Sequence, residues 1–496
     1  MPDELLSSFL LVFSFGNILA VLLGVIFGVF MGAVPGLTGT MGLALIIPLT
    51  YTLDPVAAFC ILLGCYKGCL FSGSIPAILI NTPGTPAAAA TVLDGYPLCQ
   101  QGQAGKALGM ALWSSVIGDF ISMIALVFGA LALASMATKF GPPEYSMLIL
   151  FSLTIVAGVS GDSLTKGLIA AGFGFLFGTV GLDPMTATPR FTFGAVTMMN
   201  GISLMAMLIG LFAMSEILIQ AQSQHARATL TAAISQAKIS LNDLKQCART
   251  IFRGSMIGII LGSIPGLGAT PAAFLSYSEA KRKSKRPERF GKGSLEGVAA
   301  TESANNATCG GALIPLMALG VPGDVTTAVL LGAFLIHGLA PGPVLFEENL
   351  GLVYAIFSAL FLAVILLPFV GLVAVRIFSR ILKIPKSILF PVIALLCALG
   401  IYSFNSSFAD VWTMLIFGVV GFVMRKLDFP LAPMMVGFVL EPIGERSVRQ
   451  ALTLSSGNPG IFFSTPISIL FSGLTLASLT YISFNSYKKI KQAKKS

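Results

Sequence analysis

The sequence contains few charged residues and almost no histidine. Of its 496 residues, 10% are charged and two are histidine, whereas 55% are hydrophobic and the mean hydropathy is +0.89. This composition excludes an ordinary soluble globular domain, in which about a quarter of the residues are charged. The sequence therefore predicts a polytopic membrane protein.

The shortage of histidine and the spacing of the seven cysteines limit the possible chemistry. No Cys-x-x-Cys pair occurs, and Cys65 and Cys69 are better explained as small buried side chains than as metal ligands. His225 and His337 do not fit a Ser/His/Asp set, and there is no phosphate-binding loop. We therefore expect neither enzymatic activity nor a metal or organic cofactor.

Long apolar runs are present instead, for example over residues 5–30, 107–136 and 350–375. The runs are continuous rather than alternating, and this favours helices over a β-barrel. We expect an all-α protein with about ten to fourteen membrane-embedded helices, some of them half-length. The first run follows a terminus without Lys or Arg, so we expect a retained span rather than a signal peptide.

The formal net charge of +9 comes from two basic patches, residues 281–292 and the tail after Tyr487. Without them the balance is −2, so the protein is not basic as a whole. Under the positive-inside rule, both patches are expected on the cytoplasmic side of the inner membrane. A nucleic-acid partner is not expected.

An internal repeat divides the chain. "GAVPGLTGTM" from residue 32 matches "GSIPGLGATP" from residue 262, 230 positions later, and "GSIPAILINTPGTP" from residue 73 matches "ALIPLMALGVPGDV" from residue 312, 239 positions later. Each half therefore contains two Pro-Gly interruptions in the same order. This pattern predicts two homologous halves, with the second inverted relative to the first.

The polar stretch between the halves predicts their boundary. We expect a first transmembrane half over 1–220, an amphipathic cytoplasmic linker over 221–253, a second half over 254–487 and a basic cytoplasmic tail over 488–496. Basic residues on both sides of 254–280 favour a re-entrant hairpin with "PGLGATP" at its tip.

The Pro-Gly interruptions are the candidate transport site. Proline removes an amide donor, and a break within an apolar helix leaves main-chain groups that lipid cannot satisfy. Helices that restart after such breaks direct their N-termini toward a wet cavity, where they suit a carboxylate, while freed carbonyls suit Na⁺. Helix packing and simple kinks are the alternative explanation for each break taken singly.

Hydroxyl and amide side chains cluster at the breaks, although each one alone is more often a helix-to-helix hydrogen bond than a ligand. The candidate substrate- and ion-binding residues of the first half are Pro35, Gly36, Thr38, Gly39, Thr40, Lys67, Ser72, Gly73, Ser74, Asn81, Thr82, Pro83, Gly84 and Thr85. Those of the second half are Pro265, Gly266, Gly268, Thr270, Ser303, Asn305, Asn306, Thr308, Gly310, Pro322, Gly323 and Asp324.

Ionisable residues within apolar runs are rarer and more informative. They are Lys67, Asp119, Glu216 and Asp324. Lys67 and Asp324 fall among the candidate site residues, which leaves two hypotheses. Either they form an ion pair with each other, or Lys67 meets a substrate carboxylate and Asp324 binds a coupling proton or Na⁺.

Four segments together resemble the large membrane subunit of tripartite tricarboxylate transporters, the TctA family. They are "PGLTGTMGLALIIPLTY", "GSIPAILINTPGTPAAAATVLDGYPL", "GSIPGLGATPAAFLSY" and "EGVAATESANNATCGGALIPLMALGVPGDVTTAVLLGAFLIHGLAPGP". The resemblance covers residues 28–343, and beyond them the similarity is mainly a hydrophobic pattern. The chain departs from the family pattern at Lys67, Ser72 and Asp324.

The resemblance implies a bacterial inner-membrane, ion-coupled secondary transporter that imports an organic di- or tricarboxylate with Na⁺ or H⁺. It also implies two partners, a small TctB-like membrane subunit and a TctC-like periplasmic solute-binding protein that delivers the substrate. An elevator-like movement of the broken-helix core is expected by analogy. The alternative function is a carboxylate or anion channel or exporter that works without a binding protein.

Overall fold

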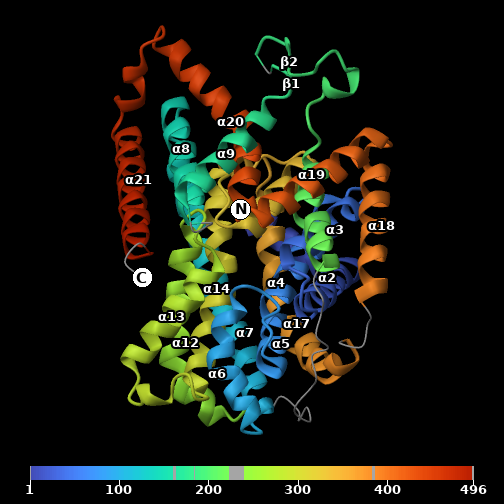
Figure 1. Cartoon of the computed structure of the whole chain (residues 1–496), viewed down its shortest axis with the longest axis vertical. Helices are drawn as coiled ribbons and strands as arrows, with labels where there is room; N and C mark the ends of the chain where they lie inside the picture. The colour runs from blue at the N-terminus through green and yellow to red at the C-terminus, as the bar shows by residue number, and fades with distance from the viewer. Residues whose placement is uncertain (1, 160–162, 184, 223–238, 382–385, 494–496) are drawn as a thin grey trace.

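The computed structural model describes residues 2–159, 163–183, 185–222, 239–381 and 386–493 (Figure 1). The described chain is almost entirely helical, as predicted. The elements of the first half are α1 (Pro2–Val12), α2 (Phe15–Ala33), α3 (Gly39–Thr50), α4 (Pro55–Ser72), α5 (Ser74–Ile80), α6 (Ala88–Gln100), α7 (Ala104–Ala137), α8 (Pro142–Val159), α9 (Leu164–Gly178), β1 (Gly181–Leu182), β2 (Pro189–Arg190), η1 (Val196–Met198), α10 (Leu204–Leu208), the π-helix η2 (Ile209–Met214) and α11 (Ser215–Gln222).

The second half follows with the same order of long and broken helices. Its elements are α12 (Leu241–Ser263), α13 (Ala269–Lys283), η3 (Pro287–Arg289), α14 (Leu295–Leu319), α15 (Val325–Ile336), α16 (Pro343–Glu348), α17 (Leu350–Ile381), α18 (Lys386–Asn405), α19 (Phe408–Lys426), α20 (Leu431–Leu454), η4 (Pro459–Phe463) and α21 (Pro466–Ala493).

Several of these helices are long enough to span a membrane. Within the described residues, six helical stretches are long and apolar enough to cross a membrane, among them Phe15–Ala33, Pro55–Ile80 and Leu350–Phe378. Shorter apolar helices include Gly39–Thr50 and Val325–Ile336, which follow Pro-Gly breaks. The protein is therefore a multi-pass membrane protein that contains half-length helices.

The internal repeat is present in the packing as well as in the sequence. Gly28 of α2 faces the main-chain oxygen of Cys65 in α4 so closely that a Cβ would lie 2.1 Å from it. Gly258 of α12 faces the main-chain oxygen of Ala304 in α14 in the same way, with a Cβ distance of 2.3 Å. The two contacts are related by the repeat offsets of 230 and 239, so the α2–α4 and α12–α14 pairs are equivalent.

The long helix of each half packs against the other half. The long helix of the first half is α7, which packs on α14, and the long helix of the second half is α17, which packs on α4. Leu112 of α7 lies against Gly371 of α17, and Phe120, further along α7, lies 6.1 Å from the earlier Phe361. These equivalent helices therefore run antiparallel, and their inversion agrees with the predicted inverted repeat.

The amphipathic connection expected over 221–253 is helical from Leu241. Ser240 and Asp243 form a capping box that starts α12 there, so the second part of that stretch belongs to the helix that ends before Pro265. Residues 223–238 lie outside the described residues. Similarly, α21 continues to Ala493, so the tail expected from residue 488 begins within a helix.

The re-entrant hairpin expected over 254–280 corresponds to α12 and α13. Gly254 of α12 packs against Ser276 of α13, and the turn between them contains Pro265. The two helices are therefore antiparallel neighbours, and they lie side by side in the lower part of Figure 1.

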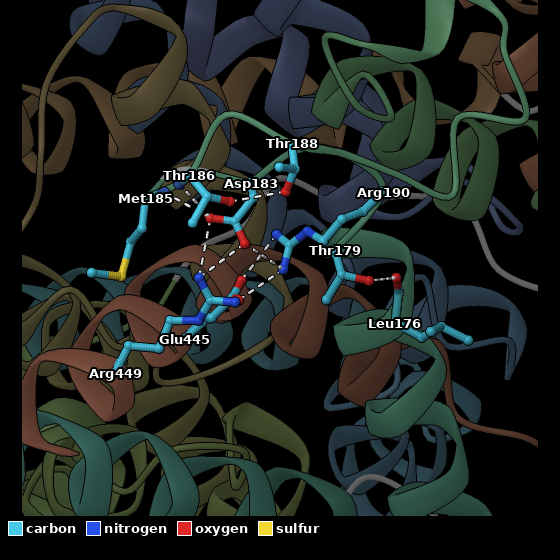
Figure 2. Close-up of polar contacts among 9 residues, drawn as sticks. All are labelled: Leu176, Thr179, Asp183, Met185, Thr186, Thr188, Arg190, Glu445 and Arg449. Carbon is cyan, nitrogen blue, oxygen red and sulfur yellow. Dashed lines mark hydrogen bonds and ion pairs between the residues drawn. The ribbon is translucent and has the colours of Figure 1, made fainter. Parts of the chain in front are cut away.

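The β1–β2 hairpin projects from the upper end of the molecule in Figure 1 and is held on α20 by ion pairs (Figure 2). Asp183 pairs with Arg449 at 2.9 Å, and Arg190 pairs with Glu445 at 2.7 Å. The amide of Met185 and the guanidinium of Arg449 lower the pKa of Asp183 to about 2. The hairpin is therefore fixed to the helical body by charges that stay ionised well into the acid range.

Candidate functional site

The first break separates α2 from α3. Gly36 adopts a φ of +95°, which glycine accommodates without strain, and Pro35 contributes no amide donor. Thr38 caps the new helix by accepting a hydrogen bond from the amide of Met41 at 3.2 Å. Gly39 then begins α3, so the predicted interruption is a real end and restart of helix.

The third break repeats this arrangement between α12 and α13. Gly266 has a φ of +84°, and Gly268 has a φ of +65° immediately before α13 starts. The amide of Gly266 donates to the carbonyl of Gly323 at 2.7 Å. This main-chain bond joins the third break directly to the fourth.

The second and fourth breaks are also equivalent. α5 ends at Asn81 with a φ of +57°, and α14 ends at the matching Gly320 with a φ of +70°. Gly84 lies against the carbonyl of Gly32, where a Cβ would approach to 2.1 Å. Gly323 lies against the carbonyl of Gly262 at the equivalent distance of 2.6 Å. The second break therefore packs against the end of α2, and the fourth break packs against the end of α12.

Two pairs of helices restart side by side. The hydroxyl groups of Thr40 in α3 and Thr326 in α15 lie 3.3 Å apart, and further along the same helices Thr50 lies 3.4 Å from His337. α3 and α15 are therefore parallel neighbours, and their N-termini, which carry partial positive charge, start together.

The other two restarts meet in the same manner. Ala87 and Ala90 at the start of α6 pack with Ala269 and Ala273 at the start of α13. Gly266 links this second pair to the first through Gly323. All four breaks thus belong to one connected region within the helical core.

Asp324 is the charged residue of this region. It caps α15 by accepting from the amide of Thr327 at 2.7 Å, and it receives a second bond from the hydroxyl of Tyr66 at 3.2 Å. A small pocket opens beside it, between the breaks and helices α8 and α20. The lining residues are Val156, Gly266, Pro322, Asp324, Val325, Ala432 and Val436.

Lys67 does not contact Asp324, and this contradicts the first of the two hypotheses, an ion pair between them. Lys67 pairs with Asp119 of α7, and both side chains are 0% exposed. The adjacent Tyr66 is the α4 residue that reaches Asp324. Lys67 is therefore paired with Asp119 in this conformation, and it does not line the pocket.

Several predicted hydroxyl ligands instead bond to main-chain carbonyls, in most cases that of the residue three positions earlier in the chain. Ser74 donates to Phe71 at 2.7 Å, Ser303 to Ala300 at 3.3 Å and Thr308 to Asn305 at 2.6 Å. Ser72 makes only weak contacts of 3.4 Å with the carbonyls of Gly28 and Cys69. The structure gives these four residues a packing role.

Other predicted residues keep free acceptor atoms. Within the described part of the chain, the buried Thr85 Oγ1, Asn305 Oδ1 and Asn306 Oδ1 have no hydrogen-bond partner. Asn305 and Thr85 occupy the positions equivalent to Tyr66 and Asp324 of the other half, which do bond to each other. These oxygens remain available to a cation or a donor.

The remaining predicted residues belong to the backbone of the breaks. Asn81, Thr82 and Pro83 are exposed, whereas the matching Gly320 and Pro322 are buried. Gly73 packs beneath Thr85, Gly310 packs on Ser122 of α7, and Thr270 lies in the first turn of α13. No group of three or more His, Cys, Asp or Glu side chains among the described residues could hold a metal ion.

Sequence reasoning missed two residues at the breaks and one buried carboxyl group outside them. Tyr66 bonds to Asp324 at the fourth break, and Thr326 in α15 lies beside Thr40 in α3. Glu302 lies buried on α14 between Thr91 and Ser115. Glu302 is a carboxylate inside an apolar helix, which was a usable signal. The other two side chains carry no charge, and only their three-dimensional contacts distinguish them.

Known proteins give this geometry its context. The family model "Tripartite tricarboxylate transporter TctA family" matches residues 18–436. An "Uncharacterized 52.8 kDa protein in TAR-I ttuC' 3'region" of Agrobacterium vitis is 37% identical over 460 residues, which are 92% of each chain. A second Agrobacterium vitis protein, from the "TAR-II ttuC' 3'region", is 37% identical over 219 residues, or 44% of this chain and 90% of that one.

No solved structure matches the chain. The family match nevertheless covers all four breaks, both equivalent helix pairs and the polar residues between them. The chain belongs to the TctA family, the large membrane subunits of tripartite tricarboxylate transporters.

Proposed function

We propose that this chain is the permease subunit of an ion-coupled importer of an organic di- or tricarboxylate, and that the substrate binds at the four breaks. The observation that carries the proposal is the side-by-side start of α3 and α15 at Thr40 and Thr326. Paired helix N-termini present free amide donors and partial positive charge to an anion. Paired discontinuous helices at the interface of inverted repeats are also typical of secondary transporters.

The coupling ion is Na⁺ or H⁺, and the breaks offer two sets of candidate ligands for it. The unpartnered oxygens of Thr85, Asn305 and Asn306 suit Na⁺, because hard cations prefer oxygen ligands. The carboxyl group of Asp324 suits either ion. Its negative charge beside the proposed anion site favours binding of the substrate together with a cation.

Alternating access is supported by the difference between the two halves. The tip of the second break is exposed at Thr82, whereas the equivalent Val321 of the fourth break is buried. Lipid does not tolerate an exposed break, so the second break faces water or a partner subunit. If the second break became buried and the fourth break became exposed, the site would open to the other side of the membrane.

The pocket beside Asp324 is the proposed place where this movement begins. Its volume of about 10 Å³ is roughly the space of one water molecule. A carboxylate enters only if α8 and α20, which contribute Val156 and Val436, move away from the breaks. An elevator-like displacement of the broken-helix core against these helices would provide that opening.

The proposed orientation places the basic residues 281–292 and the C-terminal lysines in the cytoplasm of a bacterial inner membrane. The β1–β2 hairpin lies at the end of the molecule opposite to α12 and α13 and is then periplasmic (Figure 1). We propose a small TctB-like membrane subunit and a TctC-like periplasmic binding protein as partners, because the family is tripartite.

Uptake of radiolabelled citrate, tartrate and succinate into membrane vesicles tests the proposal. The vesicles carry the full chain and a candidate small subunit, with a candidate periplasmic binding protein added or omitted. Binding-protein-dependent accumulation of at least one compound is expected, and Thr326→Val lowers it because the α15 start is altered. Thr413→Val is the matched control, since its hydroxyl bonds only within α19. Rapid downhill flux without the binding protein would instead identify a channel.

A further inference from the structure

A buried carboxyl group outside the breaks has no cationic partner. Glu302 lies on α14 and is 0% exposed. Its Oε1 contacts the hydroxyl of Thr91 in α6, and its Oε2 lies 3.2 Å from the hydroxyl of Ser115 in α7. No Lys, Arg or His side chain of the described residues is within ion-pair distance of it.

The neighbouring helices carry other titratable groups, and each has its own environment. They include Lys67 and Tyr66 of α4, Asp94 of α6, Asp119 of α7, Cys247 of α12 and Tyr277 of α13, with Cys309 on α14 itself. Lys67 is paired with Asp119, and Asp94 accepts from the amides of Gly291, Gly293 and Ser294. None of these groups supplies a positive charge in contact with Glu302.

The hydrogen count around Glu302 favours its neutral form. Thr301 has one hydroxyl proton and two carbonyls within reach, those of Val298 at 3.0 Å and Gly297 at 3.2 Å. Thr91 lies 2.9 Å from Thr301 and also contacts Glu302, yet it too has a single proton.

If Thr301 donates to a carbonyl, Thr91 must donate to Thr301, and the contact between Thr91 and Glu302 then needs a proton from the carboxyl group. A protonated Glu302 therefore completes the chain from Glu302 through Thr91 and Thr301 to the backbone. An ionised Glu302 leaves one of these contacts without a proton.

The second carboxyl oxygen accepts a hydrogen bond from the hydroxyl group of Ser115. Asn306 donates to Ser115 at 2.7 Å, so the hydroxyl proton of Ser115 points to Glu302. Ser115 lies one helical turn before Asp119, the partner of Lys67. Glu302 is therefore held by α6, which starts at the second break, and by α7, which also carries the buried ion pair.

We propose that Glu302 is the proton-binding site of the transporter, that it is neutral in this conformation, and that it releases its proton when the contacts with Thr91 and Ser115 open. This assignment rests on the proposed function, since it names H⁺ as the coupling ion of the same carboxylate importer. Movement of α6 relative to α14 would expose the carboxyl group to water. The acid proton would pass to water, and the carboxylate would take up a new proton from the other side.

Infrared spectroscopy of the purified full chain in lipid tests the proton site without transport. We expect the C=O stretching band of a protonated carboxyl group at neutral pH, and its loss in Glu302→Gln. An amide in this position can donate to Thr91 and accept from Ser115, so this variant preserves the contacts. Glu216→Gln is the matched control, because Glu216 is buried but paired with Arg425. A band unchanged by Glu302→Gln would overturn the proposal.

A second variant keeps the test decisive if Glu302→Gln fails to fold. Thr91→Val removes the acceptor of the carboxyl proton and is expected to shift the band to higher frequency. Glu302→Asp is expected to retain a protonated-carboxyl band at an altered position. A spectrum that stays the same in both variants would contradict a neutral Glu302.

Vesicle transport then separates proton coupling from carboxylate transport. In wild type, a gradient of one pH unit is expected to change citrate, tartrate or succinate accumulation by about tenfold for each proton coupled. Glu302→Gln should lose this response yet retain exchange of labelled for unlabelled substrate. Accumulation driven only by Na⁺ would overturn the assignment of H⁺. No transport of any carboxylate would contradict the proposed function, while the infrared result would still decide the proton site.

Discussion

The hydroxyl groups of Thr40 and Thr326 lie 3.3 Å apart although 286 residues separate them in the chain. Their contact joins the helix that restarts after the first break to the helix that restarts after the last. Because helices α6 and α13 restart together in the same way, the repeat produces two parallel pairs of helix N-termini. This arrangement is the structural basis of the proposed carboxylate site.

Alanine at the closing glycines should destabilise the protein. Gly84→Ala and Gly323→Ala each place a Cβ within 2.1 Å or 2.6 Å of a carbonyl oxygen, and such overpacking costs about 1–3 kcal/mol. Gly172→Ala is the control, since nothing lies within 4 Å of that position. A thiol-reactive dye can follow thermal unfolding, because all seven cysteines are free and buried. Equal melting temperatures for the three variants would contradict the packing of the breaks.

Removing one member of the Lys67–Asp119 pair should be more harmful than removing both. Lys67→Met leaves a buried carboxylate without its partner, which costs about 3–5 kcal/mol. Lys67→Met/Asp119→Leu removes both charges and should recover most of that stability. Lys67→Met/Asp324→Asn should show no recovery, because Asp324 bonds to Tyr66 and Thr327 instead. Recovery in this last variant would instead support an ion pair between Lys67 and Asp324, the first of the two hypotheses from the sequence.

The charge of Asp324 should be needed for transport but not for folding. Asp324→Asn keeps a good N-cap for α15, so its melting temperature should stay close to that of wild type. Carboxylate accumulation should fall at least about tenfold because the pocket beside the helix starts loses its charged group. Asp54→Asn is the matched control, since Asp54 caps α4 at an exposed position. Unchanged accumulation in Asp324→Asn would remove this residue from the site.

The hairpin on α20 should remain attached in moderate acid. The pKa of Asp183 is lowered to about 2, so its ion pairs contribute stability above its ordinary pKa, and this contribution is lost as the pH falls through about 2. Cleavage by an acid protease within residues 191–200 should therefore be slow at pH 4 and accelerate toward pH 2. Asp183→Asn should be cleaved readily throughout, whereas Glu279→Gln, which removes an exposed pair on α13, should behave as wild type.

The sequence predicted the breaks and their repetition because proline and glycine act locally. Pro35 and Pro265 interrupt their helices whatever the surrounding packing. The left-handed conformation at Asn81 recurs at the equivalent Gly320. The sequence did not predict the partner of Lys67. Neighbouring residues on a helix point about 100° apart, so only the packing of α4 against α7 and α15 decides that Tyr66, rather than Lys67, reaches Asp324.

The sequence also did not predict which of the candidate hydroxyl ligands bond to the backbone and which remain without a partner. A Ser or Thr within a helix can bond back to its own backbone, as Ser74 and Thr308 do, and residue type alone does not reveal this choice. The start of α12 was not predicted, because its first turns are polar, although Ser240 caps them as a helix.

Cross-linking tests the central claim most directly. In a full chain whose native cysteines are replaced, Thr40→Cys/Thr326→Cys should form a disulfide under mild oxidation, because the two side chains already meet. Citrate, tartrate or succinate, whichever is transported, should slow that reaction by occupying the space between the helix starts, and each single variant should not cross-link. A pair that never cross-links, or one whose rate ignores a transported carboxylate, would contradict a site built from converging helix N-termini.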